Sequence, residues 1–211
     1  MLFSTQQRIE SLLTTIDRLG IVKIKHLQQI HDLNYRNACR IISSQLRPFI
    51  HETFYQKEKV IYLNKKGREL IASEKEVQVN QQTLHSLLRN GVYIHFNCPS
   101  DWQNEYTLET AGNALNSFGI SFQIGTLTNT KKLIADAVFK RNGYMNIIEV
   151  DNEQKMSDNK KKIDSYKDVL PAYKSETPIL YFFTKTENRK RKLEEWMKGI
   201  RHEVKTFEEI K

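Results

Sequence analysis

Apolar residues recur every three or four positions near the start of the chain, which is the spacing of amphipathic helices. This spacing predicts a first helix over residues 5–19, which Gly20 ends. A second helix passes through Leu27 and Ile30, and a third ends at Pro48, which cannot continue it.

Two strand-like runs follow the third predicted helix. They cover residues 49–56 and 60–63, and a polar Gln-Lys-Glu-Lys turn separates them. A further helix at about 65–73 closes the segment. The order helix, helix, helix, two-stranded wing, helix is that of a winged helix-turn-helix, which we expect over residues 1–74.

The same segment is basic. Its first 72 residues hold 12 Lys and Arg against 6 Asp and Glu, and such a surface favours nucleic acid. In a winged helix-turn-helix the third helix enters the major groove, where Arg36, Asn37 and Arg40 are the expected readers of base edges. Lys57 and Lys59 at the wing turn are expected to hold phosphates. Protein docking or dimerisation by the same fold is the open alternative.

A second domain is expected to follow a polar linker. The linker covers residues 74–82, and the domain covers 83–211. Its first predicted elements are a helix from Thr83 to Asn90-Gly91, a strand at 92–96, a helix at 103–117 and a strand at 120–124.

The centre of this domain is the stretch 133–151, where two apolar runs flank the turn Arg141-Asn142-Gly143. Asn-Gly between strand-like runs is a strong signal of a β-hairpin. Downstream, the pattern predicts a charged helix at 157–170, a buried central strand at 178–183, a basic helix at 187–198 and an edge strand at 204–207. The expected fold class is therefore mixed α/β (α+β).

Three carboxylates lie on the predicted hairpin: Asp136, Glu149 and Asp151. Glu149 and Asp151 are two apart and share a face, and Asp136 lies early on the partner strand, where it is expected to meet them. Crowded carboxylates repel one another unless a cation compensates them. A metal ion at all three, or salt bridges to lysines such as Lys162 on the next helix, would both satisfy this condition.

The arrangement resembles the PD-(D/E)xK nuclease core, a restriction-endonuclease-like mixed α/β fold. In that family two acidic residues, here Asp136 and Glu149, bind Mg²⁺, and a lysine orients or activates the attacking water. Asp151 stands where that lysine usually stands, so the resemblance implies a weak or absent nuclease. The missing positive charge has three candidate sources nearby: Lys140, Lys155 and Lys162.

The whole chain resembles the replication-relaxation family of plasmids and mobile elements in low-GC Gram-positive bacteria. The residues that carry the resemblance are Trp102 with Glu105, residues 135–139, residues 148–151 and Tyr166. The family combines a winged helix-turn-helix with a nuclease-like domain. The resemblance therefore implies DNA binding linked to plasmid replication, nicking or transfer.

Composition narrows the class of protein further. The formal net charge is +8, which favours a polyanionic partner. No apolar run approaches the roughly 20 residues of a membrane span, and the N-terminus lacks the order of a signal peptide. With only Cys39 and Cys98 there is no disulfide framework. We expect a cytoplasmic protein with no membrane partner.

Three functions remain in competition. The first is a non-catalytic protein, expected as a homodimer on double-stranded DNA, that acts in plasmid or mobile-element replication, transfer or transcriptional control and needs no cofactor. The second is a Mg²⁺-dependent DNA nickase or endonuclease that uses Asp136, Glu149, Asp151 and Lys162. The third is an adaptor that docks to a replication or conjugation protein without contacting DNA.

Overall fold

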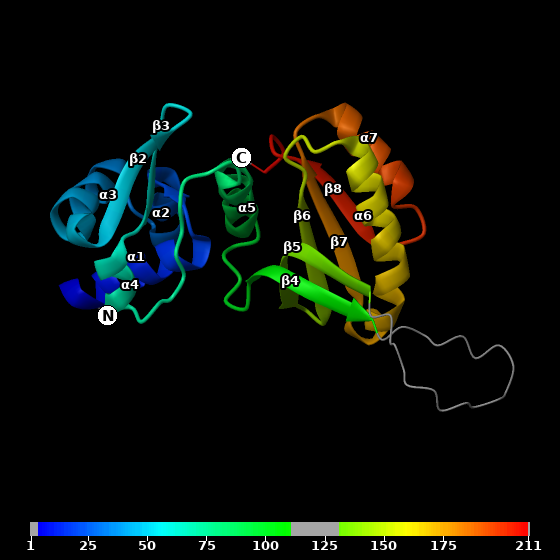
Figure 1. Ribbon diagram of the computed structural model, residues 1–211, viewed down its shortest axis with the longest axis horizontal. Coiled ribbons are helices and arrows are strands. Elements are labelled where there is room, and N and C mark those ends of the chain that lie inside the picture. The colour runs from blue at the N-terminus through cyan, green and yellow to red at the C-terminus, as the bar shows by residue number, and fades with distance from the viewer. Residues whose placement is uncertain (1–3, 111–130, 211) are drawn as a thin grey trace, which may run out of the picture. The chain divides into compact units, whose positions relative to one another are not determined.

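The chain forms two compact units. The computed structural model describes residues 4–110 and 131–210 (Figure 1), and it divides the chain into a first unit, residues 1–98, and a second unit, residues 99–210. The first unit contains a three-stranded sheet and the second a five-stranded sheet, each with helices. No helix in the described ranges is long and apolar enough to cross a membrane.

Three helices open the first unit: α1 (Thr5–Leu19), α2 (Ile24–His31) and α3 (Tyr35–Ile41). Ser4 caps α1, because its hydroxyl accepts a hydrogen bond from the Gln7 backbone N–H. Asn34 caps α3 by accepting from the Asn37 N–H. Beyond α3 the chain continues as a π-helical turn over Ile42–Leu46 and a 3₁₀ turn over Arg47–Phe49.

The sheet of the first unit has the strand order β1-β3-β2 and is antiparallel. Its strands are β1 (Val22–Lys23), β2 (Ile50–Tyr55) and β3 (Glu58–Leu63), and α4 (Lys65–Leu70) follows. β2 and β3 form the expected hairpin, with Gln56 and Lys57 at positive φ in the turn. The third helix and the two strands that the sequence predicted after it therefore lie in the same unit.

The boundary between the units lies later than the sequence indicated. Helix α5 (Thr83–His95) belongs to the first unit, where it packs against α2 and β1. Asn90 Nδ2 donates to the Ile21 carbonyl at 2.7 Å. Residues 74–82 are no free linker, because their two valines pack against a small apolar cluster. The cluster consists of Ile21, Val60 and Leu87, and the valines are Val77 and Val79.

The strand predicted at 92–96 is also wrong, because these residues continue α5 almost to their end. Val92 and Tyr93 are buried together with Leu87 in α5, so helical packing outweighs the short alternating pattern. Gly91 lies inside this helix and does not end it.

The sheet of the second unit has the strand order β4-β5-β6-β7-β8 (Figure 1). β4–β5 and β5–β6 pair antiparallel, and β6–β7 and β7–β8 pair parallel. The strands are β4 (Gln103–Thr110), β5 (Lys131–Arg141), β6 (Tyr144–Val150), β7 (Pro178–Thr184) and β8 (His202–Thr206). The predicted central strand and edge strand are confirmed as β7 and β8.

The helix predicted at 103–117 is wrong over its first eight residues. These residues form β4 and pair with β5 from Gln103↔Val138 to Thr110↔Lys131. Pairing with a distant strand satisfies backbone groups that the local pattern had assigned to a helix. The rest of that prediction, and the strand predicted at 120–124, fall outside the described residues.

The predicted β-hairpin is confirmed as β5 and β6. Asn142 and Gly143 form the turn, with φ of 53° and 79°. Positive φ at both central residues is the requirement of the tight hairpin turn that Asn-Gly favours.

Two helices, α6 (Met156–Val169) and α7 (Glu187–Trp196), lie along one face of this sheet (Figure 1). A 3₁₀ segment, Leu170–Glu176, follows α6. Together with this segment, the helices and the strands bury one apolar core. It includes Met145, Ile147, Ile163, Val169, Leu180, Phe182, Leu193 and Val204.

Candidate functional site

Two of the three predicted carboxylates meet on the second unit's sheet. The pairing of Ala137 with Ile148 brings Asp136 on β5 next to Glu149 on β6. Asp136 Oδ2 also accepts a hydrogen bond from the Val150 backbone N–H at 2.6 Å. This bond fixes the Asp136 carboxylate at the hairpin, where its charge acts on Glu149.

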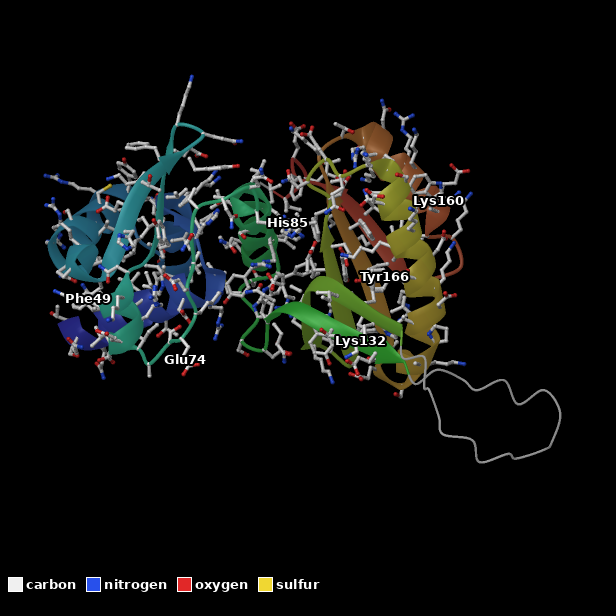
Figure 2. All side chains as sticks on the ribbon, in the orientation of Figure 1. Phe49, Glu74, His85, Lys132, Lys160 and Tyr166 are labelled. Carbon is white, nitrogen blue, oxygen red and sulfur yellow. The ribbon has the colours of Figure 1, made fainter. Side chains whose placement is uncertain are left out.

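Glu149 is buried beneath α6, with 3% of its side chain exposed. Lys162 Nζ lies 2.6 Å from Glu149 Oε2, and the Tyr166 hydroxyl donates to Oε1. Lys162 and Tyr166 are four apart on α6 and therefore share one face of the helix. Tyr166 lies between α6 and the sheet (Figure 2). Both oxygens of the Glu149 carboxylate are thus hydrogen-bonded.

The surroundings of Glu149 favour the protonated form of its carboxyl group. Burial and, after it, the nearby charge of Asp136 raise the pKa of Glu149 to about 8, although Lys162 and Tyr166 oppose the rise. Burial disfavours the charged form of Lys162, but Glu149 and Asp136 outweigh it and hold the pKa of its ammonium group above the ordinary value. Two carboxylates therefore share one ammonium group, and a cation or a proton stabilises them.

Asp151 lies in a different environment. It is 1% exposed and receives two hydrogen bonds from Arg189 on α7, from Nε to Oδ2 at 2.5 Å and from Nη2 to Oδ1 at 2.6 Å. The Thr184 hydroxyl donates to Oδ2 at 2.7 Å. This fork-like pairing satisfies the carboxylate completely, so Asp151 has no need of a metal ion.

The predicted three-carboxylate cluster is therefore divided in two. Within residues 4–110 and 131–210 no three His, Cys, Asp or Glu side chains are placed to share a metal ion. Asp136 and Glu149 remain as a pair, and Mg²⁺ in proteins commonly takes one or two carboxylates and completes its shell with water and substrate phosphate. The chemistry of this pair fits such an ion, provided that Lys162 releases an oxygen of Glu149.

The sequence left the lysine partner open, and the structure selects one of the three candidates. Lys162 contacts Glu149, whereas Lys140 Nζ pairs with Glu176 at 2.6 Å. The roles of Tyr166 and Arg189 were missed. The i, i+4 spacing of Lys162 and Tyr166 was a usable signal for the first, but no local spacing connects Arg189 with Asp151.

A second candidate site lies on α3 and the β2–β3 turn of the first unit. Arg36 and Arg40 are exposed and lie four apart on α3, so they share a face. Asn37 is half-buried. Lys57 is exposed at the turn, at φ 68°, while Lys59 Nζ is held by Glu52 Oε2 at 2.6 Å.

Aromatic side chains accompany these cations. Tyr35 on α3 is 64% exposed and Phe54 on β2 is 70% exposed. A hydrogen bond with Cys39, four residues along α3, raises the pKa of the Tyr35 hydroxyl. A surface pocket of about 540 Å³ lies between residues 43–47 and the strands β2 and β3, and Arg47, His51 and Lys59 are among its lining residues.

Comparison with known proteins identifies no relative of this chain. No protein-family model, curated protein or solved structure matches this chain. The candidate function therefore depends on the geometry of the two sites.

Proposed function

We propose that this protein binds double-stranded DNA through its first unit, which acts as a winged helix-turn-helix. In this proposal α3 enters the major groove, and the β2–β3 turn contacts the adjacent backbone. The second unit serves as a nuclease-like module with an incomplete catalytic set. The biological role is in plasmid or mobile-element replication, transfer or transcriptional control, as the family resemblance implies.

One observation carries the proposal: Arg36 and Arg40 are exposed on one face of α3 and form no ion pair among the described residues. Two guanidinium groups on one exposed helix face suit bidentate contacts to guanine, or contacts to phosphate. The neighbouring wing adds Lys57, and Tyr35 adds an exposed aromatic ring. The net charge of the first 72 residues supports the same partner.

A gel-shift titration of the full chain with a duplex library tests this proposal. Arg36→Ala with Arg40→Ala is expected to weaken binding to the preferred duplex by roughly 1–3 kcal/mol per arginine and to relax sequence preference. Lys65→Ala with Lys66→Ala, which removes the same charge from exposed positions on α4, is the matched control. Equal losses in both double variants would contradict the proposed reading helix.

The salt dependence of binding tests the wing separately. Lys57→Ala is expected to lower the slope of log affinity against log salt by about 0.9, because one phosphate contact is lost. Lys59→Ala is expected to change the slope less, since Glu52 already holds Lys59. Absence of any duplex binding at low salt, together with capture of a replication or conjugation protein, would favour the docking adaptor instead.

A second function is favoured by the position of Lys162. A lysine on α6 contacts Glu149 beside Asp136, which is the set of charges that a Mg²⁺-dependent DNA nickase or endonuclease of the PD-(D/E)xK type needs. Asp136 and Glu149 would hold the ion, and the ion would polarise the scissile phosphate and activate water. Lys162 would then orient that water or stabilise negative charge on the phosphate.

Cleavage of supercoiled plasmid in Mg²⁺ or Mn²⁺ tests this second function. If the protein is a nuclease, Asp136→Ala and Lys162→Met abolish nicking, while Asp164→Ala, at an exposed position on α6, leaves it intact. Nicking that survives the first two substitutions would exclude this site. Absence of nicking by the wild-type protein with either metal would exclude the enzyme.

A further inference from the structure

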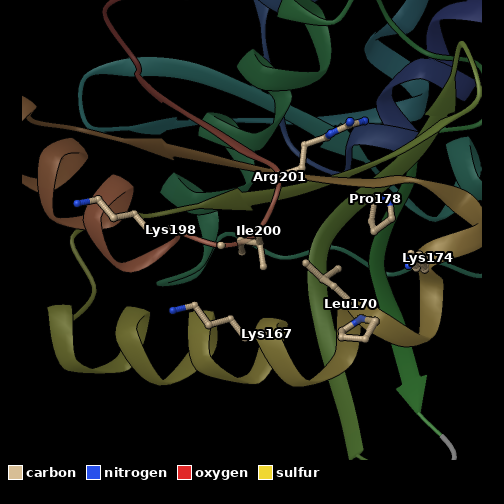
Figure 3. A pocket seen from close by; sticks show the side chains of 9 residues that line it. Lys167, Leu170, Lys174, Pro178, Lys198, Ile200 and Arg201 are labelled. Atoms are coloured by element: carbon tan, nitrogen blue, oxygen red, sulfur yellow. The ribbon is translucent and has the colours of Figure 1, made fainter.

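A surface pocket of about 440 Å³ lies on the second unit (Figure 3). It is formed by the end of α6, the 3₁₀ segment that follows, and the segment between α7 and β8. β7 begins at its edge, at Pro178. Glu149 and Asp151 lie at the opposite end of β6 from Met145, which pairs with Pro178. The pocket is therefore separate from the Asp136–Glu149 pair.

The lining combines an apolar floor with a basic rim. Leu170 and Ile200 face each other across the pocket (Figure 3). The basic side chains are Lys167, Lys174, Lys198 and Arg201. None of the nine lining residues, all within the described ranges, is acidic. The pocket thus presents positive charge around a surface that favours an apolar ring.

The three lysines of the pocket differ from six other lysines of this unit. Lys132, Lys140, Lys162, Lys185, Lys190 and Lys205 each pair with a glutamate. By contrast, Lys167, Lys174 and Lys198 are exposed and form no ion pair within the described parts of the chain. Arg201 stacks over the Tyr144 ring at 5.2 Å, and its side chain extends away from Lys167 and Leu170 (Figure 3).

The negative ends of nearby helix dipoles do not neutralise the positive charge of the pocket. α6, the 3₁₀ segment and α7 all end near the pocket, and each helix C-terminus contributes about half of one negative charge at most. The three lysine charges alone exceed that amount. Like charges gathered around one cavity repel one another, so a ligand with several negative charges is the partner that this arrangement favours.

We propose that this basic pocket binds a nucleotide. Its phosphates contact Lys167 and Lys198, and its base or sugar lies over Leu170 and Ile200. The volume falls within the range of about 300–1,000 Å³ that is typical of small-molecule sites. The nucleotide is either free in solution or the terminal unit of a DNA strand. This inference does not depend on duplex binding by the first unit.

Fluorescence anisotropy of the full chain with two probes tests the proposal. One probe is a fluorescent ATP analogue, and the other is a labelled single strand of about ten nucleotides that carries a 5′-phosphate. The pocket variant is Lys167→Glu with Lys198→Glu. The matched control is Lys161→Glu with Lys192→Glu, which places the same charge change on exposed positions of α6 and α7 outside the pocket.

At least one probe is expected to bind the wild-type protein and to lose about tenfold or more in affinity in the pocket variant, but less than about threefold in the control. Binding of the ATP analogue alone identifies a free nucleotide, and binding of the strand alone identifies a strand end. No binding of either probe at low salt, or equal losses in both variants, would overturn the proposal. Arg36→Ala with Arg40→Ala leaves this binding unchanged, so duplex binding and pocket binding can fail independently.

Discussion

At the scale of single residues, Glu149 and Asp151 show how the surroundings decide what a buried carboxylate does. Glu149 lies at the end of β6, Asp151 lies just beyond it, and both are almost fully buried. Asp151 receives a fork of hydrogen bonds from Arg189, whereas Glu149 shares one lysine with Asp136. The first arrangement compensates the charge of the carboxylate and satisfies both of its oxygens. The second retains unbalanced negative charge and can take up a proton or a metal ion.

The proton held by Glu149 leads to a pH-dependent stability. Its pKa rises from 4.5 in the unfolded chain to about 8 in the folded protein, so the folded state binds more protons between these values. The free energy of unfolding should therefore fall as pH rises from about 5 to 8. Relative to Glu149→Gln, the wild-type protein is expected to lose roughly 2–5 kcal/mol across this window.

Urea denaturation at several pH values measures this difference. Glu195→Gln, at an exposed position on α7, is the control and should follow the wild-type curve. A wild-type stability that stays level or rises with pH relative to Glu149→Gln would show that folded Glu149 is ionised throughout this window.

The Asp151–Arg189 pair is expected to stabilise the fold more than an exposed pair does. Asp151→Ala leaves Arg189 and Thr184 without their partner and should cost about 3–5 kcal/mol of unfolding free energy. Glu153→Ala breaks the exposed Lys185–Glu153 pair and should cost less than about 1 kcal/mol. Chemical denaturation of the two variants checks the comparison; similar values would mean that the Asp151 site is hydrated.

At the scale of elements, α4 depends on one glycine for its position. A Cβ built on Gly67 would lie 2.1 Å from the Phe49 backbone oxygen, which also accepts a hydrogen bond from the Asn64 N–H. The helix can approach the 3₁₀ turn before β2 only because this position has no side chain.

Gly67→Ala and Gly91→Ala are therefore expected to have opposite effects. Alanine at 67 must displace the backbone and should destabilise the protein by about 2–4 kcal/mol, despite its higher helix propensity. Alanine at 91, inside α5, meets nothing within 4 Å and should stabilise by about 0.5–1 kcal/mol. Thermal unfolding of both variants measures these shifts, and a gain of stability at position 67 would be inconsistent with this packing of α4.

At the scale of the whole molecule, the division into two units separates the proposed activities. The exposed arginines of α3 and the β2–β3 turn lie in the first unit, and the acidic pair and the basic pocket lie in the second. Loss of one activity by substitution need not affect the other. The tests proposed for duplex, metal and nucleotide can therefore be made in one full-length protein.

The proposed winged helix-turn-helix leads to an expected homodimer. Two copies would place two reading helices on successive half-sites of duplex DNA. Sedimentation equilibrium at micromolar concentration is expected to give twice the chain mass of 24.9 kDa. A monomer at that concentration, with or without duplex, would contradict this expectation.

The sequence by itself determined the elements whose signals are local. Asn142-Gly143 specified the β5–β6 hairpin because few residues tolerate positive φ twice in succession. The continuous apolar run at 178–183 specified a strand that lies between two others. Charge and helical spacing located α6 and α7 to within two residues at each end.

Only the tertiary structure decided what depends on distant partners. β4 is a strand because β5, which follows it by more than twenty residues, accepts its backbone hydrogen bonds. Residues 74–95 belong to the first unit because Ile21 and Val60 cover their apolar side chains. Asp151 left the predicted cluster because Arg189, thirty-eight residues later, reaches it. Local periodicity does not indicate such pairings, because they form between surfaces that exist only once the chain has folded.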